Sequence, residues 1–180
     1  MSDAERSSHP GTARRKLALP RWFLLLLSVT VWPLLIFLFH AVLPWAIAGM
    51  ARRFGWVEQH PGWWNWPGLV FVGLGTIVVL WFWFVHVRKV AVPPTVELEW
   101  TPRYLLTDGP YLYSRNPMYL AVLTIWFGWA VFLGSFLVLV GDFLGWLLLN
   151  FFVIPREERG LATRHGEHYR QYANNVPRWI

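Results

Sequence analysis

Long apolar runs alternate with shorter polar segments along most of this chain. Four runs are nearly free of charged residues, and they cover residues 22–48, 67–87, 118–133 and 136–154. A helix needs about 20 mostly apolar residues to cross a bilayer, and the runs approach or exceed that length. The pattern therefore predicts an all-α integral membrane protein with about four transmembrane helices. The first run is longer than a bilayer requires, so we expect it to tilt, or to kink at Pro33 and Pro44.

The last two runs are joined only by Gly134-Ser135. So short a connection predicts a tight helical hairpin over residues 117–154. After Pro155 the chain becomes polar, and several side chains recur at helical spacing on one face: Glu157, Leu161, His165, His168 and Tyr172. We expect a C-terminal helix in this part of the chain.

The sequence divides into three regions. Residues 1–21 are polar and basic, and we expect a disordered cytosolic arm there. Residues 22–92 hold the first two spans. The loop between these spans, residues 49–66, ends in a Trp-rich stretch that we expect to anchor at the membrane interface. Residues 93–180 hold a polar segment, in which Pro93-Pro94 breaks any helix, and then the hairpin and the polar C-terminal part.

Composition narrows the class of protein further. Hydrophobic residues make up 56% of the 180 residues and charged residues only 14%, which excludes an ordinary soluble domain. The 14 Trp are an excess typical of rings at headgroup depth, and the absence of Cys excludes disulfides and thiolate metal sites. No other metal-ligand spacing is present. The formal charge of +6 comes from cations that flank apolar runs, so we expect anionic lipid headgroups rather than nucleic acid as partners.

The basic residues also predict the orientation in the membrane. With a cytosolic amino terminus, the inner side holds five Lys and Arg in residues 1–21, four in 88–116 and five in 155–180, against two in 49–66. Fourteen against two is a clear positive-inside bias. We therefore expect both termini in the cytosol (at the inner membrane, if the protein is bacterial). The two large polar segments would then face the cytosol together.

The hairpin would bring Arg115 close to Glu157 and Glu158. A planar cation, two carboxylates and several Tyr suit a zwitterionic ligand that carries an aromatic ring, and S-adenosylmethionine is such a ligand. The residues alone leave an alternative open. Arg115 is equally consistent with a cation that extends to the membrane interface, and the two Glu with a solvated first helical turn, which the helix dipole favours.

Two polar motifs on either side of the hairpin carry a resemblance to a known family. In chain order the residues are Gly109-Pro-Tyr111, Arg115-Asn-Pro-Met-Tyr119, an apolar hairpin, Glu157-Glu158, Leu161, Gly166, Tyr169, Tyr172 and Val176-Pro-Arg178. This order resembles the isoprenylcysteine carboxyl methyltransferase and phospholipid methyltransferase group, which are integral membrane enzymes that use S-adenosylmethionine. The resemblance covers residues 93–180, which makes them the predicted catalytic region.

The resemblance implies a cofactor site at the cytosolic face, with Arg115 and Glu158 in the catalytic role. The residues that it assigns to S-adenosylmethionine are Gly109, Tyr111, Arg115, Asn116, Pro117, Tyr119, Glu157, Glu158, Tyr169 and Tyr172. Two positions depart from the pattern. Asn116 stands where many members have His, so a role that needs an imidazole is in doubt. His165 stands where an aromatic residue often precedes the Gly, which would reshape the wall of the site.

The resemblance implies a reaction by in-line displacement at a sulfonium methyl group, with a lipophilic acceptor that enters from the bilayer. A prenyl-cysteine-like carboxylate needs orientation, for which Arg115 is suited. A phospholipid amine headgroup must first lose a proton, which Glu157 or Glu158 would accept. Two alternatives remain: a sterol-reductase-like membrane oxidoreductase that uses NADPH, and a non-catalytic membrane scaffold protein.

A few polar residues and glycines inside the spans support separate predictions. His40 and Asp142 lie at similar depth, so we expect them to face one another or share water, with an interfacial or protonated Asp142 as the alternative. We expect His86 to extend to the interface, and Asn150 to form a helix–helix hydrogen bond or reach the cofactor pocket. Gly73-Leu-Gly75 lies inside a span with no strand before it, so we expect close helix packing rather than a dinucleotide site.

Overall fold

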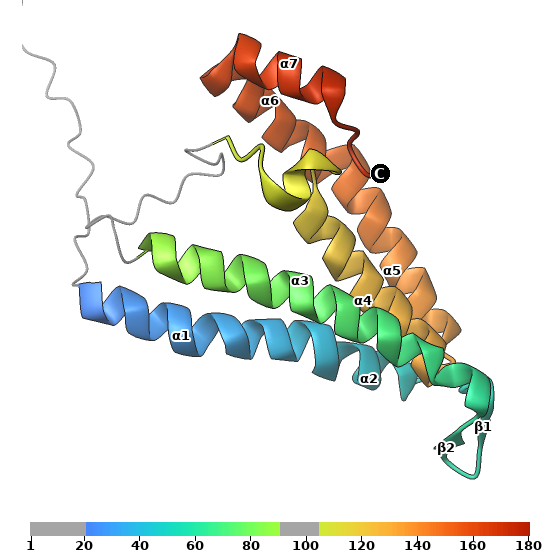
Figure 1. Cartoon of the computed structure of the whole chain (residues 1–180). Coiled ribbons are helices and arrows are strands. Elements are labelled where there is room, and N and C mark those ends of the chain that lie inside the picture. The colour runs from blue at the N-terminus through green and yellow to red at the C-terminus, as the bar shows by residue number, and fades with distance from the viewer. Residues whose placement is uncertain (1–20, 91–104) are drawn as a thin grey trace, which may run out of the picture.

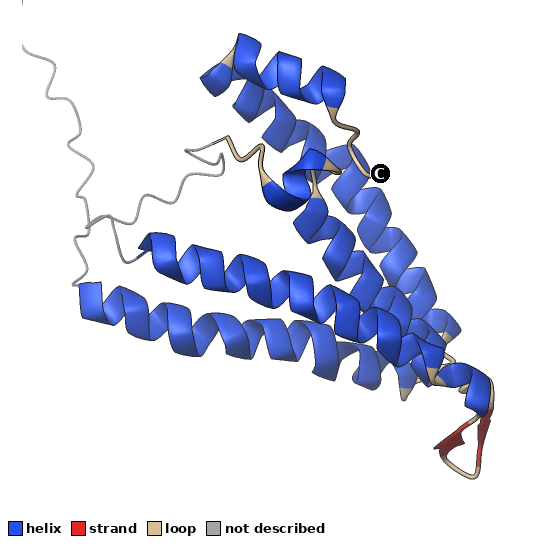
Figure 2. Ribbon diagram, viewed as in Figure 1, coloured by secondary structure: helices blue, strands red, loops and turns tan. Residues whose placement is uncertain are grey.

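The computed structural model describes residues 21–90 and 105–180 and is almost entirely helical (Figures 1 and 2). The predicted arm up to residue 20 and the break at Pro93-Pro94 lie outside the described residues. The helical elements are α1 (Arg21–Phe37), η1 (Leu38–Val42), α2 (Leu43–Ala48), η2 (Trp63–Asn65), α3 (Pro67–Val90), η3 (Gly109–Leu112), α4 (Pro117–Leu133), α5 (Phe136–Leu148), η4 (Leu149–Val153), α6 (Ile154–His165) and α7 (Glu167–Asn175).

The predicted membrane-protein class is confirmed by the length and apolar character of the helices. Within the described residues, three helical stretches are long and apolar enough to cross a membrane: Val29–Ala48, Trp63–Val85 and Phe136–His165. Helix α4 is apolar but has only 17 residues, so it is about 25 Å long and lies at the lower limit for a span. The first run contains a π-helical turn, η1, which lies between Pro33 and Pro44; a tilt, or a kink at these prolines, stays a prediction.

The tight hairpin between α4 and α5 is confirmed. Gly134 follows α4 with a φ of 56°, a left-handed conformation that glycine adopts without steric cost. Ser135 then caps α5, because its hydroxyl oxygen accepts a hydrogen bond from the Val138 amide at 3.4 Å. Two adjacent residues thus end one helix and begin the next.

Helices α3 and α4 pack closely because glycines lie at their contact. A Cβ atom built on Gly68 would lie 2.5 Å from the carbonyl oxygen of Gly128, and one on Gly75 would lie 2.6 Å from that of Ala121. Such small residues let two helix backbones approach in a membrane. The close-packing prediction is confirmed for Gly75. It is wrong for Gly73, where an added Cβ atom would meet no neighbouring helix within 4 Å. Beyond this contact the two helices diverge (Figure 1).

The loop at the apex of the bundle contains a small β-hairpin that the sequence did not predict. Strands β1 (Trp56–Val57) and β2 (His60–Pro61) pair antiparallel. Hydrogen bonds fix this loop to the end of α4. The Phe54 amide donates to the Gly134 carbonyl oxygen at 2.8 Å, and the buried Asn65 side chain donates to the Val131 carbonyl oxygen, also at 2.8 Å.

The predicted C-terminal helix is interrupted at Gly166, so the face of recurring side chains is not continuous. Gly166 has a φ of 55° and a ψ of −124°, a conformation that only glycine adopts readily. Helix α7 therefore folds back beside α6 instead of extending it (Figure 1).

Of the described polar residues inside the spans, only Asn150 is seen with a partner other than the expected ones. His40 Nδ1 and Asp142 Oδ1 are both buried, and neither has a hydrogen-bond partner among the described residues. These two atoms are therefore not bonded to one another. A water shared by the two side chains stays a prediction. The Asn150 side chain accepts a hydrogen bond from Trp179 Nε1 at 3.1 Å, and its partner is thus the C-terminal tail rather than another span. The side chain of His86 lies outside the described residues.

Candidate functional site

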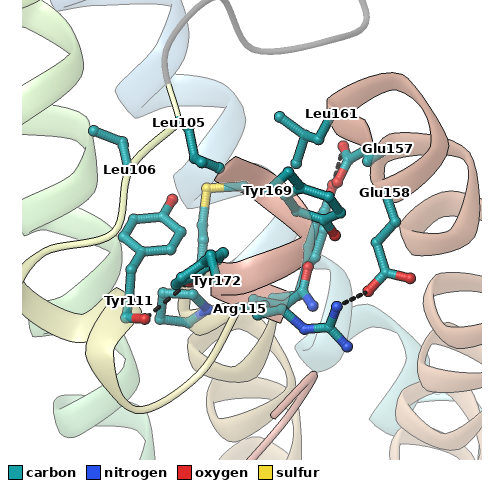
Figure 3. Close-up of a pocket in the computed structure, with 13 residues that line it drawn as sticks. Leu105, Leu106, Tyr111, Arg115, Glu157, Glu158, Leu161, Tyr169 and Tyr172 are labelled. Atoms are coloured by element: carbon teal, nitrogen blue, oxygen red, sulfur yellow. Dashed lines mark hydrogen bonds and ion pairs between the residues drawn. The ribbon is translucent and has the colours of Figure 1, made fainter. Parts of the chain in front are cut away.

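A cavity of about 200 Å³ (Figure 3) is lined by the segment before α4 and by α6 and α7, at the end of the bundle away from the β-hairpin (Figure 1). Every residue predicted for the cofactor site lines it except Gly109: Tyr111, Arg115, Asn116, Pro117, Tyr119, Glu157, Glu158, Tyr169 and Tyr172. Leu105, Leu106, Met118 and Leu161 complete the wall. The two polar motifs on either side of the hairpin therefore meet at one cavity.

Gly109 is the predicted residue that the structure places outside the cavity wall. It has a φ of 59° and begins the 3₁₀ turn η3. This turn directs Tyr111 into the cavity, where its ring also contacts Phe82 of α3 edge-on at 5.7 Å between centroids. Gly109 thus acts on the site through the backbone conformation that it permits.

Glu158 is held by two arginines. The Arg178 guanidinium donates to both carboxylate oxygens, from Nε at 3.2 Å and from Nη2 at 2.6 Å. Arg115 Nη1 lies 3.2 Å from Glu158 Oε1, the oxygen that also accepts from Arg178 Nε. Forked pairing of this kind fixes both the position and the plane of a carboxylate. The Glu158 side chain is only 19% exposed, so its charge depends on these two cations.

The last part of the chain, which we call the C-terminal clip (residues 176–179), is bonded to the segment before α4. The Arg115 amide donates to the Pro177 carbonyl oxygen at 2.9 Å. The Arg178 carbonyl oxygen accepts from the Asn116 side chain at 3.0 Å and from the Ser114 hydroxyl at 3.3 Å. These bonds bring the Arg178 side chain to Glu158.

Asn116 has a definite role in this arrangement. Its side-chain amide donates to the backbone of the clip, and its backbone amide donates to the Ser114 hydroxyl oxygen at 3.1 Å. The residue therefore joins the cavity wall to the clip. A carboxamide can donate in this way without an imidazole, which accounts for Asn at this position in physical terms.

Glu157 has different partners from its neighbour. Its Oε1 atom accepts a hydrogen bond from the Tyr119 hydroxyl at 2.8 Å, and no cation lies within ion-pair distance of it among the described residues. The two consecutive glutamates thus differ in charge environment. Glu158 is neutralised by guanidinium groups, whereas within the described residues Glu157 has the Tyr119 hydroxyl as its partner.

Tyrosines form much of the remaining wall. The Tyr172 hydroxyl donates to the Tyr111 carbonyl oxygen at 2.8 Å, which ties α7 to the turn η3 (Figure 3). Burial raises the pKa of Tyr111 and that of Tyr172 to about 12 each. Burial also raises the pKa of Tyr169, whose ring lies 6.4 Å from that of Tyr172. These phenols are therefore neutral at physiological pH and offer ring faces and hydroxyl groups to a ligand.

One donor at the cavity has no partner among the described residues. Arg115 Nε is buried and makes no hydrogen bond to them, although Nη1 of the same group pairs with Glu158. A buried unpaired N–H is costly unless a ligand or water satisfies it.

Arg178, which pairs with Glu158, was not predicted for the site, although it belongs to the Val176-Pro-Arg178 motif. Sequence reasoning missed it because nothing in the order of residues shows that the chain returns to Glu158.

The fold and the cavity define a helical membrane protein with a tyrosine-lined site at one end of its bundle, where an arginine and two glutamates meet. Comparison with known proteins then identifies the family: residues 63–168 match the family model described as phospholipid methyltransferase. Because the match covers more than half of the chain, the protein belongs to this family of membrane methyltransferases, which confirms the resemblance.

A second comparison finds an uncharacterized protein of Haemophilus influenzae, which is 40% identical to this chain over 63 residues. That alignment covers 35% of this chain and all of the H. influenzae protein. No solved structure matches the chain. The family match includes the segment before α4 and both glutamates, and it ends before Tyr169, Tyr172 and the C-terminal clip.

Proposed function

We propose that the protein is an S-adenosylmethionine-dependent methyltransferase that binds this cofactor in the cavity and methylates a lipophilic acceptor from the bilayer. The observation that carries the proposal is the charge arrangement around Arg115, which lines the cavity and has a buried Nε donor without a partner among the described residues. Membership of a methyltransferase family supports the reaction class.

The charges at the cavity suit the amino-acid part of the cofactor. Arg115 and Arg178 share the single carboxylate of Glu158, so the three groups together carry one net positive charge. A ligand carboxylate would neutralise this excess by bonding to Arg115 while Arg178 keeps Glu158 in place. Glu157, which has no cation partner among the described residues, is the group for an ammonium or for ribose hydroxyls.

The rings at the cavity suit the rest of the cofactor. Neutral tyrosine faces attract a cation, which a sulfonium centre is, and pack against an adenine ring. The described residues enclose about 200 Å³, less than the roughly 300–1,000 Å³ of a typical small-molecule pocket, so they account for part of the ligand's surroundings. When bound, S-adenosylmethionine would supply a sulfonium methyl group that a nucleophile accepts in an in-line displacement.

The protein residues have separate tasks in such a reaction. For an amine acceptor, a base must remove a proton, and Glu157 suits this task better than Glu158, which two guanidinium groups already neutralise. For a carboxylate acceptor no base is needed, and Arg115 orients the nucleophile. In both cases the leucines of the wall, Leu105, Leu106 and Leu161, keep water from the reacting atoms.

Ligand binding tests the proposal and its alternatives. The full chain, purified in detergent, is titrated with S-adenosylhomocysteine and with NADPH while its thermal unfolding is followed. We expect stabilisation by S-adenosylhomocysteine alone, because only a ligand that binds the folded state raises its melting temperature. Stabilisation by NADPH alone would support the oxidoreductase alternative, and no response to either would support the scaffold alternative.

Variants locate the site. Arg115→Lys and Glu157→Gln should weaken S-adenosylhomocysteine binding, because each removes a charged partner of the ligand. Arg170→Ala is a matched control at the same end of the bundle, since this side chain is 70% exposed and does not line the cavity. Equal binding by the parent and both cavity variants would show that the cofactor binds elsewhere. Transfer of a labelled methyl group into a membrane lipid extract would then identify the acceptor.

The orientation of the cavity is part of the proposal: the positive-inside bias supports a cavity that faces the cytosol. The chain has no Cys, so a single cysteine introduced at Arg170 or at Arg52 gives a clean probe. In intact cells, a membrane-impermeant maleimide should label Arg52→Cys and leave Arg170→Cys unlabelled. The reverse labelling pattern would show that the protein has the opposite orientation in the membrane.

A further inference from the structure

A second hollow lies at the apex of the bundle, opposite the proposed catalytic cavity. It has a volume of about 870 Å³ and lies between α2, the β-hairpin loop and the end of α4. Its wall includes Trp45, Arg53, Trp56, His60 and Phe132. Neither the family match nor the proposed reaction assigns a role to these residues.

Arg53 is held in a corner between two indole rings. Its guanidinium carbon lies 4.6 Å from the centroid of Trp56 and 5.1 Å from that of Trp45. The two rings are nearly perpendicular, at 86°, so they restrict the cation in two directions. Contacts of this kind attract a cation through the ring face and use none of its N–H donors.

The N–H groups of Arg53 have no acceptor within the described part of the chain. Among the described residues, the Arg53 side chain contacts the two indole rings, and no carboxylate there pairs with it. Glu58, the acidic residue of the same loop, is exposed at the hairpin tip and does not line the hollow. A planar guanidinium that is fixed through its face presents its edge for forked binding of an anion.

The surrounding loop is built firmly enough to hold a ligand. Trp56 Nε1 donates to the Phe132 carbonyl oxygen at 3.0 Å, which fixes one of the two rings against α4. The bonds from Phe54 and Asn65 to the α4–α5 turn hold the rest of the loop. The cation is thus placed before any ligand arrives, which lowers the entropy cost of binding.

The depth of this site in the membrane points to a lipid. Trp63, Trp64 and Trp66, which follow the hairpin, are all more than half exposed, and exposed Trp side chains in membrane proteins gather at the headgroup level. Phosphate is the anion found at that level, and forked pairing suits its oxygens. We propose that Arg53 binds the phosphate of a lipid headgroup, in the leaflet opposite the catalytic cavity.

Native mass spectrometry of the full chain, released from detergent micelles, tests this site by counting bound molecules. The probes are phosphatidylglycerol, phosphatidylcholine and inorganic phosphate. We expect phosphatidylglycerol to bind most tightly, because its headgroup adds no competing cation. Arg53→Gln should raise its apparent dissociation constant about tenfold, which corresponds to about 1.4 kcal/mol.

Arg52→Gln is the matched control, because the neighbouring Arg52 carries the same charge but is exposed and does not line the hollow. We expect it to change lipid binding less than about twofold, a change of under about 0.4 kcal/mol. Unchanged binding by Arg53→Gln would overturn the proposal, as would an equal loss in Arg52→Gln, which indicates general charge attraction. Inorganic phosphate that displaces phosphatidylglycerol at equal concentration would also overturn it, because the site would then bind a soluble anion.

A further variant covers the case in which Arg53→Gln does not fold. Arg53→Lys keeps the charge and the ring attraction but loses the planar fork. We expect weaker lipid binding than in the parent, with the melting temperature retained. Binding equal to that of the parent would contradict forked recognition of a phosphate.

Discussion

Replacement of Arg178 by Met gives the sharpest test of how the cavity is organised. The substitution keeps most of the apolar stem and removes the guanidinium that binds both oxygens of Glu158. The bonds from Asn116 and Ser114 survive, because they end on the Arg178 carbonyl oxygen rather than on its side chain. The variant therefore removes the positive charge of the clip while the clip keeps its position.

The size of the effect follows from the contacts that are lost. A hydrogen bond to a charged group contributes about 1.5–3 kcal/mol, and Arg178 makes two of them. The Arg178 side chain is 32% exposed, so water replaces part of this energy. Glu158 also keeps Arg115. We expect a net loss of about 1–2 kcal/mol, which corresponds to roughly 5- to 30-fold weaker cofactor binding if Arg115 must then pair with Glu158 instead of the ligand.

Isothermal titration with S-adenosylhomocysteine measures this loss, and thermal unfolding of the same samples reports the effect on the fold. Arg178→Lys should recover part of the affinity, because an ammonium restores the charge but not the fork. A double-mutant cycle with Glu158→Gln isolates the pair. The reasoning is refuted if Arg178→Met binds like the parent, or if the cycle gives no coupling between the two positions.

Two further predictions concern packing and pH. Gly75→Ala should destabilise the protein by about 1–3 kcal/mol, because its Cβ would meet α4 backbone, while Gly73→Ala should be tolerated; equal melting temperatures would contradict the close contact. Stability should fall as the pH rises from about 10 to about 12, because the unfolded chain then loses phenol protons that Tyr111 and Tyr172 keep in the fold. Phenolate absorbance gives the check: ionisation of all tyrosines near pH 10 in the folded protein would contradict their burial.

The membrane helices could be predicted well because each is encoded by its own local composition. The hairpin turn was also predictable, since Gly134-Ser135 supplies a helix stop and a helix cap side by side. The interruption at Gly166 was missed because an isolated glycine does not break a helical pattern unless the tertiary structure requires a positive φ there. The β-hairpin was missed because Glu58 and Gln59 both have positive φ, where turn-forming glycine or asparagine is usual.

The candidate site shows a similar division. The side chains that the resemblance selected gather at one cavity because the hairpin returns Glu157 and Glu158 to the level of Arg115. The different partners of the two glutamates could not be inferred, since adjacent residues on a helix point in directions about 100° apart and the sequence does not show what each one meets. Arg178 reaches the site through backbone bonds of the clip, for which side-chain patterns give no signal.

The C-terminal clip has a consequence for the order in which the protein matures. Its residues are synthesised after the described membrane helices and after both glutamates, and domains assemble during synthesis from the amino terminus onward. The bundle can therefore enter the bilayer while Glu158 still lacks one of its two arginines. If the proposed function holds, the cofactor would reach its full affinity only after residues 176–179 have bonded to the segment before α4.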